Sequence, residues 1–232
     1  MHALTTAITG AIEWFAEYSN SLGMAILGFA VLTKLFLLPI TFFGMGWQEQ
    51  FQARLKNVEA LVKALDVADP EQRDTEILAI YRANGITIAN QFKALLPLLV
   101  QLPILLAFYR AMTTWDVVEE TSFLWIQDLS QPDTLFSLGT SLPWMGASFN
   151  LLPLLLFAAH STEIMLFPDK TLSVKSFVLP ITFFVLFYPF PASCMLFWVT
   201  LNILRIPERF CYRRFRQNNE AYPENYPTDN GT

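Results

Sequence analysis

Residues 22–43 read LGMAILGFAVLTKLFLLPITFF, and this stretch decides the fold class. It holds one charged residue, Lys34, in an otherwise apolar run. An α-helix rises about 1.5 Å per residue, so roughly 20 such residues cross a hydrocarbon layer about 30 Å thick. The stretch therefore predicts a transmembrane helix that carries one ionisable side chain inside the bilayer.

The composition of the whole chain is typical of a membrane protein. Of its 232 residues, 53% are hydrophobic and 15% aromatic, and the mean hydropathy is +0.38. These values exceed what soluble domains usually show. The formal net charge of -5 hides a strong sorting of charges between segments.

Four further apolar stretches follow along the chain, at about residues 94–112, 150–167, 176–190 and 191–210. Some of them are short for a full crossing. Residues 188–191 (YPFP) separate the last two, and their prolines predict a tight turn. We therefore expect an all-α integral membrane protein with five transmembrane helices and a core over residues 22–213.

Two segments are predicted to be helical without crossing the bilayer. Residues 46–90 mix charges with apolar residues at helical spacing, which predicts a water-exposed helical hairpin. Its second helix has Asp69 as N-cap and Pro70 at the first position, and it ends at Asn84-Gly85. Residues 1–21 form an amphipathic helix that lies either in the membrane interface or packed on protein.

The basic residues predict the orientation. Thirteen of the 15 lysines and arginines fall in the hairpin, after the third apolar stretch, or at the C-terminal end. With five crossings they all lie on one side, which the positive-inside rule makes cytoplasmic. The N-terminus and the tryptophan-rich loop 114–149 then face outward. The polar tail, residues 214–232, is predicted to be cytoplasmic and disordered.

Polar side chains on four of the predicted spans share one depth. Counted from the outer ends, Lys34, Gln101, Glu163 and Asn202 all lie roughly 17–20 Å deep. An ionisable group at mid-bilayer costs about 2.5–3.5 kcal/mol on insertion scales, so it normally faces a polar cavity or a partner. If these groups converge, they form a wet chamber.

Each of these residues also has a structural interpretation. Lys34 and Glu163 form either part of the chamber or an ion pair that joins two helices. Gln101 and Asn202 make either client contacts or hydrogen bonds between helices. His160 lies one helical turn before Glu163, and the two form either a proton relay or internally satisfied groups.

The sequence gives no sign of an enzyme. It has no protease serine motif, no HExxH and no phosphate-binding glycine loop. Cys194 and Cys211 are 17 positions apart on one predicted helix, too far for a disulfide, and no metal-ligand spacing is present. We expect no cofactor, no metal and no DNA partner.

Several motifs occur in a recognisable order. They are residues 32–39 (LTKLFLLP), 96–104 (LPLLVQLPI) followed by Phe108-Tyr109, 123–129 (FLWIQDL), 150–153 (NLLP), and Pro191-Ala192 with Phe197-Trp198 and Asn202. In combination they resemble the YidC/Oxa/Alb membrane-protein insertase superfamily over roughly residues 22–210. The most specific of them is the second.

The resemblance implies a five-helix core with a hydrophilic groove that opens to the cytoplasm and to lipid. In such a groove a client's polar tail enters transiently while its apolar segment slides into the bilayer. By position Lys34 is the groove cation, which draws in acidic tails, and the other groove residues are Gln101, Glu163, Asn202 and Trp198. Family members in bacteria usually have arginine in place of Lys34.

The resemblance also implies partners and a location. The partners are nascent membrane proteins and the lipid bilayer, with the ribosome, the Sec translocon or a dedicated membrane complex as further candidates. The location is the bacterial inner membrane. Two alternatives to an insertase remain open: a specialised scaffold or assembly subunit of one membrane complex, and a proton-coupled transporter that uses His160, Glu163 and Lys34.

Overall fold

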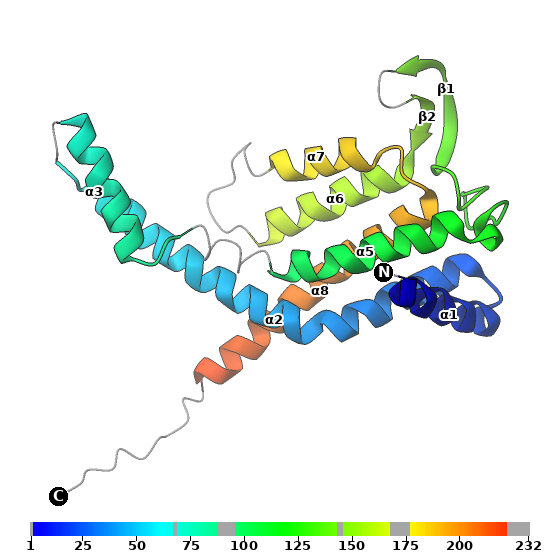
Figure 1. Ribbon diagram of the computed structural model, residues 1–232, viewed down its shortest axis with the longest axis horizontal. Helices are drawn as coiled ribbons and strands as arrows, with labels where there is room; N and C mark the ends of the chain where they lie inside the picture. The colour runs from blue at the N-terminus through cyan, green and yellow to red at the C-terminus, as the bar shows by residue number, and fades with distance from the viewer. Residues whose placement is uncertain (1, 67–68, 88–95, 143–145, 168–176, 222–232) are drawn as a thin grey trace, which may run out of the picture.

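The apolar stretch that begins at Leu22 forms the first half of one long helix, α2 (Leu22–Lys63). Ser21 is its N-cap, and the Ser21 side chain accepts a hydrogen bond from the backbone N–H of Met24. The structure is a computed structural model that describes residues 2–66, 69–87, 96–142, 146–167 and 177–221 (Figure 1). Residues 88–95 and 168–176, with Lys93, Lys170 and Lys175, lie outside the described residues, as does the end of the tail from residue 222.

Helix α2 continues far beyond its apolar half. The sequence predicted a span over residues 22–43 and a separate hairpin over 46–90, whereas the structure has one continuous helix from Leu22 to Lys63. Glycine inside a helix costs about 1 kcal/mol but keeps its backbone hydrogen bond, so Gly44 and Gly46 weaken the helix without ending it. Charged residues then follow on the same helix axis.

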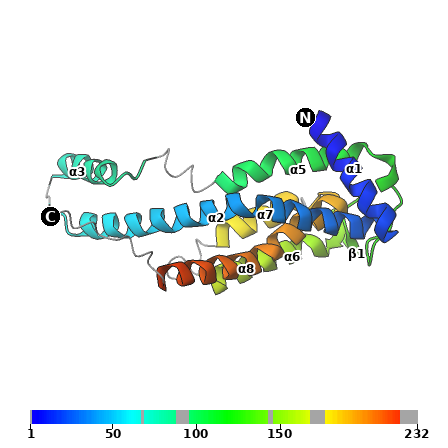
Figure 2. The ribbon, with the colours of Figure 1, turned by 90° about the horizontal axis from the view of Figure 1, so that it is seen from below.

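The second helix of the predicted hairpin is α3 (Pro70–Ala83), which lies beside the C-terminal part of α2 (Figures 1 and 2). Asp69 is its N-cap and accepts a hydrogen bond from the N–H of Glu71. The helix ends where Gly85 takes a positive φ of 69°, a conformation that favours glycine. The arm made by α3 and the end of α2 projects from the rest of the chain.

Five other helices lie in the part of the chain that the structure describes. They are α1 (His2–Ser19), α5 (Leu96–Thr114), α6 (Leu151–Leu166), α7 (Val178–Phe187) and α8 (Ala192–Ala221), with a short 3-10 turn, η1 (Asp116–Val118). Helix α8 packs against α2 and against α6, while α6 also packs against α7. Helix α1 packs on α2 and α5 at the end away from α3 (Figure 2).

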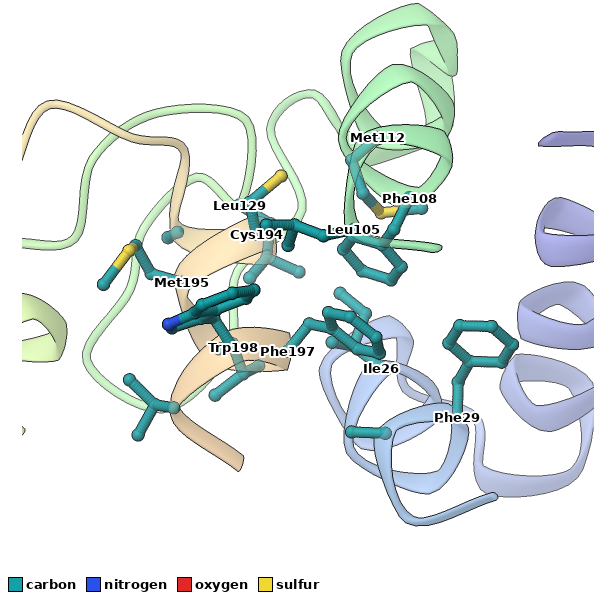
Figure 3. Close-up of a cluster of buried hydrophobic side chains, with 14 of the residues drawn as sticks. Ile26, Phe29, Leu105, Phe108, Met112, Leu129, Cys194, Met195, Phe197 and Trp198 are labelled. Carbon is teal, nitrogen blue, oxygen red and sulfur yellow. The ribbon is translucent and has the colours of Figure 1, made fainter. Parts of the chain in front are cut away.

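The apolar core lies at the end of the bundle near α1. Phe29 of α2, Phe108 of α5 and Phe197 of α8 form a group of stacked rings, and the centroids of Phe108 and Phe197 are 4.2 Å apart (Figure 3). Such ring pairs contribute about 0.5–1.5 kcal/mol beyond the area that they bury. Ile8 and Ile12 of α1 add to the same core.

The loop at residues 114–149 contains a β-hairpin that the sequence did not predict. Strands β1 (Thr134–Leu142) and β2 (Gly146–Asn150) form an antiparallel hairpin, which lies at the same end as α1 (Figure 1). Phe136 and Phe149 stack across it with centroids 4.8 Å apart. Residues 134–150 contain no charge and alternate apolar with small polar residues, a pattern that a two-stranded ribbon accommodates.

The tail also differs from the prediction. Helix α8 runs to Ala221, so residues 214–221 are helical where disorder was expected from residue 214. The reason is that residues 208–221 contain neither glycine nor proline, and arginine and glutamine favour helices.

Among the described residues, α2 is the one helix that is both long and apolar enough to cross a membrane by length and composition. Shorter apolar helices occur at Leu99–Thr114, Leu151–Leu166 and Val178–Phe187. All four carry exposed apolar side chains, such as Phe36, Leu102, Leu155 and Leu186.

Candidate functional site

Charged side chains from three helices meet just beyond the apolar core. Lys34 of α2 lies one helical turn after the buried Ala30, and its Nζ is 2.6 Å from Oε2 of Glu208 on α8. The Lys34 side chain is 13% exposed and that of Glu208 is 3% exposed. The cation therefore has a resident carboxylate partner and is nearly enclosed.

Glu163 of α6 pairs with two arginines of α8. Its Oε1 lies 3.1 Å from Nη1 of Arg209 and 3.1 Å from Nε of Arg205. Glu163 and Arg205 are also close enough to act electrostatically on Lys34. Lys34, Glu163, Arg205, Glu208 and Arg209 are together called the charged seam.

The charged seam has one more cation than it has acids when all five groups are ionised. Three cations from α2 and α8 face two carboxylates from α6 and α8. A buried ion pair is costly to form but still more costly to break, because the partner left behind is an uncompensated charge. The seam therefore holds α2, α6 and α8 together and keeps ionised groups between them.

Two of the predicted site residues bond within their own helices. Nδ2 of the buried Asn202 donates a hydrogen bond of 2.8 Å to the carbonyl of Trp198. Nδ1 of His160 lies 3.0 Å from the carbonyl of Leu156. Since Glu163 pairs with arginines, the structure joins neither Glu163 to His160 nor Glu163 to Lys34 directly.

Trp198 and Gln101 lie apart from the ion pairs of the seam. Trp198 is 5% exposed and packs against the rings of Phe183 and Phe187, with centroids 6.3 and 5.4 Å away. Its indole Nε1 is buried without a hydrogen-bond partner among the described residues. Gln101 is half-buried on α5. The structure thus brings Lys34 and Glu163 into one cluster with α8 but does not bring all the predicted residues into contact.

A polar cavity lies next to the seam, farther along α2 and α8. It has a volume of about 260 Å³ and is lined mainly by polar side chains, including Gln52, Lys56, Arg209 and Tyr212. Arg209 belongs both to the cavity and to the seam. Polar side chains therefore extend from Lys34 toward the α3 end of the molecule.

At this cavity, α2 and α8 make a second group of polar contacts. Glu49 accepts a hydrogen bond of 3.3 Å from the Tyr212 hydroxyl and forms an ion pair with Arg216. Burial and the neighbouring Glu49 carboxylate raise the pKa of the Tyr212 hydroxyl above its ordinary value, which keeps it protonated. Polar residues of α8 thus make contacts to α2 or α6 along the whole stretch from Arg205 to Arg216.

Sequence reasoning missed Glu208 and the roles of Arg205 and Arg209. The arginines were assigned to the cytoplasmic end, and Glu208 stood unnoticed among them. The spacing held a signal. Glu208 and Arg209 follow Arg205 by three and four residues, so all three side chains lie on one face of a helix. Leu201 and Phe197 lie one and two turns before Arg205 on the same side of α8, and both are buried in the apolar core.

The fold and the seam define a helical membrane protein with ionised groups enclosed between its helices. Residues 14–220 match the family model described as 60Kd inner membrane protein. The chain belongs to this family, the YidC/Oxa/Alb superfamily, as its motifs predicted.

Relatives described as membrane protein insertase YidC support the same assignment. The chain is 26% identical over 210 residues to the protein of Syntrophobacter fumaroxidans, which covers 88% of this chain and 36% of that protein. It is 28% identical over 208 residues to the protein of Amoebophilus asiaticus, covering 88% of this chain and 34% of that protein. Membrane protein insertase YidC 1 of Streptococcus agalactiae is 26% identical over 203 residues, covering 86% and 70%.

A solved structure has the same fold. It is described as an active YidC insertase crystal structure with the first transmembrane domain resolved. The TM-score is 0.59 at 18% sequence identity, and the match covers 88% of this chain and 46% of that chain. The chain therefore spans about a third of the length of the first two relatives and less than half of the solved chain.

Proposed function

We propose that this protein inserts transmembrane segments of client proteins into the bacterial inner membrane. In this proposal the apolar stretches form five crossings, with the N-terminus and the β1–β2 hairpin outside and the C-terminus in the cytoplasm. The arm of α2 and α3 then stands in the cytoplasm. The distribution of basic residues supports this orientation.

Exposed apolar side chains support a lipid-facing bundle. Phe36 of α2 is 77% exposed. Leu106 of α5 is 50% exposed and Leu186 of α7 is 56% exposed. Contiguous apolar surface of this kind is rare on soluble monomers but normal against acyl chains. The outer faces of these helices are therefore suited to contact lipid.

The charged seam is the observation that carries the proposal. Lys34 and Glu208 form an ion pair inside a bundle whose outer faces are apolar, and the polar cavity adjoins the seam through Arg209. Ionised groups at this depth are expected only where water, a partner or a visiting chain can reach them. The seam and cavity together provide a polar path that ends at Lys34.

This path lowers the main barrier to insertion, which is the transfer of a polar or charged tail through hydrocarbon. An isolated charge at mid-bilayer costs about 2.5–3.5 kcal/mol on insertion scales. A tail that reaches Lys34, Arg205 and Arg209 exchanges water for charged hydrogen-bond donors, so it avoids part of that cost. Its apolar segment remains free to move along the lipid-facing helices.

The proposal is tested with purified protein in proteoliposomes. A single-span client with a short acidic tail is added, and protease protection of the tail measures insertion. We expect Lys34→Met to lower the protected fraction severalfold, whereas Lys34→Arg retains it because the charge remains. Insertion that is equal with wild-type protein, Lys34→Met and empty liposomes would contradict the proposal.

One observation favours the scaffold as a second candidate. The charged seam nearly balances its own cations, so it also fits a purely structural role that joins α2, α6 and α8. Purification in mild detergent separates the two functions. A stoichiometric membrane partner together with no insertion in proteoliposomes supports the scaffold, and insertion by the isolated protein contradicts it.

A further inference from the structure

We infer that Glu208 is a built-in competitor for the client: its carboxylate occupies Lys34 at rest, and a client's acidic group must displace it. The inference rests on the proposed insertase function and deepens it, because it makes Glu208 the residue that sets the preference for acidic tails. Glu208 comes from α8 and Lys34 from α2, so the exchange takes place between two helices.

The geometry assigns Glu208 to this role. Its Oε2 is 2.6 Å from Nζ of Lys34, and among the described residues Lys34 has no other ion-pair partner. The opposite oxygen, Oε1, is buried without a hydrogen-bond partner among those residues. The carboxylate is therefore held chiefly by Lys34 and has few other bonds that oppose its departure.

The other charged groups around Lys34 are committed elsewhere. From α6, Glu163 accepts a hydrogen bond from Arg209 and forms an ion pair with Arg205. This leaves Lys34 as the cation whose single carboxylate partner a visiting acid can replace without breaking the contact between α6 and α8. A client carboxylate that binds Lys34 takes over the same type of charged hydrogen bond.

The displaced carboxylate has a place to go. Arg205 precedes Glu208 by three residues on α8, a spacing that puts their side chains on the same helix face. The Arg205 side chain is 43% exposed, so it can accept a second carboxylate partner at its open side. Glu208 thus exchanges Lys34 for Arg205 or water when the client arrives.

A competing carboxylate of this kind lowers the apparent affinity of Lys34 for a client's acidic tail, and in this way it affects which clients are preferred. A site that is free for only a fraction of the time binds its ligand more weakly by that fraction. Acidic tails meet the competition directly, whereas neutral tails have little affinity for Lys34 and are little affected. Removal of the Glu208 charge is therefore expected to raise the preference for acidic clients.

The experiment uses the full-length protein in proteoliposomes and two clients that differ only in the tail, with two aspartates or two asparagines. In Glu208→Gln, we expect the ratio of acidic to neutral client inserted to rise roughly threefold to tenfold. Asp74→Asn is the control, because it removes a negative charge on the exposed face of α3, outside the seam and the polar cavity. That variant is expected to leave the ratio unchanged.

The outcomes separate the inference from the proposed function. If Lys34→Met lowers acidic insertion but Glu208→Gln leaves the ratio unchanged or lowers it, the inference fails and the function stands. If wild-type protein inserts neither client, the function itself fails. Should Glu208→Gln not fold, as judged by size-exclusion chromatography, Glu208→Asp replaces it. Its shorter carboxylate contacts Lys34 less well, so the ratio should rise by a smaller factor, and an unchanged ratio overturns the inference.

Discussion

Oε1 of Glu163 on α6 lies 3.1 Å from Nη1 of Arg209 on α8. Arg205 reaches the same oxygen from one helical turn earlier, also at 3.1 Å. One carboxylate thus joins two guanidinium groups of the neighbouring helix, and the contact positions α8 so that Glu208 meets Lys34.

Loss of the Glu163 charge should destabilise the protein. In Glu163→Gln two arginines lose their anionic partner, and we expect a cost of roughly 1–3 kcal/mol, below that of a fully buried pair because Arg205 is partly exposed. Thermal unfolding in detergent measures the effect, with Asp74→Asn on the exposed face of α3 as control. A midpoint for Glu163→Gln equal to that of the control would show that the pairs are not formed.

Asp133 should make the stability of the loop at residues 114–149 depend on pH. Its buried carboxylate accepts hydrogen bonds from Trp125 Nε1 and from the N–H groups of Leu151 and Leu152, at 3.2, 2.9 and 2.7 Å. Burial raises the pKa of Asp133 above its ordinary value, although these hydrogen bonds oppose the shift. The folded protein therefore holds this proton more tightly than the unfolded chain does.

The sign of the effect follows from that pKa. The contribution of Asp133 is fully present below the ordinary carboxyl pKa of about 4 and is lost as pH rises through the raised value. Relative to Asp133→Asn, wild-type protein should lose thermal stability as the pH rises above about 4. Melting curves of both proteins across this range test it, and a difference that is constant or opposite in sign refutes the assignment.

Gly23 should tolerate no side chain. A Cβ built at this position in α2 would lie 2.0 Å from Cγ of Phe123, whose ring packs against the start of the helix. Gly23→Ala is expected to cost about 1–3 kcal/mol through overpacking, despite the better helix propensity of alanine. In the double variant with Phe123→Ala, the added cost of Gly23→Ala should largely disappear. Additive losses in thermal stability would place the ring elsewhere.

The positions of the helices could largely be predicted from sequence. Apolar runs and caps placed α5, α6 and α7 within a few residues, because hydrophobic period and proline or glycine breaks are local signals. The β1–β2 hairpin could not be predicted, since its strands gain stability from pairing with each other. The continuation of α2 through Gly46 was also missed, because a glycine marks a helix end only in a suitable context.

The pairings of the site could not be predicted from the sequence. Counting residues from the ends of the predicted spans singled out Lys34 and Glu163, and in the structure both make ion pairs to α8. Their partners depend on which helix lies between them, and α8 packs against both α2 and α6. Lys34 and Glu163 therefore pair with Glu208 and Arg205 of α8 rather than with each other. These pairs depend on how each helix is rotated about its axis, which the periodicity of one sequence does not determine.

Position 34 also offers the most direct test of the central claim, that a client chain visits the charged seam. A photoreactive lysine analogue that keeps the side-chain ammonium group is placed at position 34, and a matched photoreactive residue at Ile26, which is fully buried two turns earlier on α2. Each protein is incubated in proteoliposomes with a ribosome-stalled client and irradiated. The account predicts a crosslink from position 34 to the client's polar tail and none from position 26. A client that inserts without crosslinking to position 34 would contradict it.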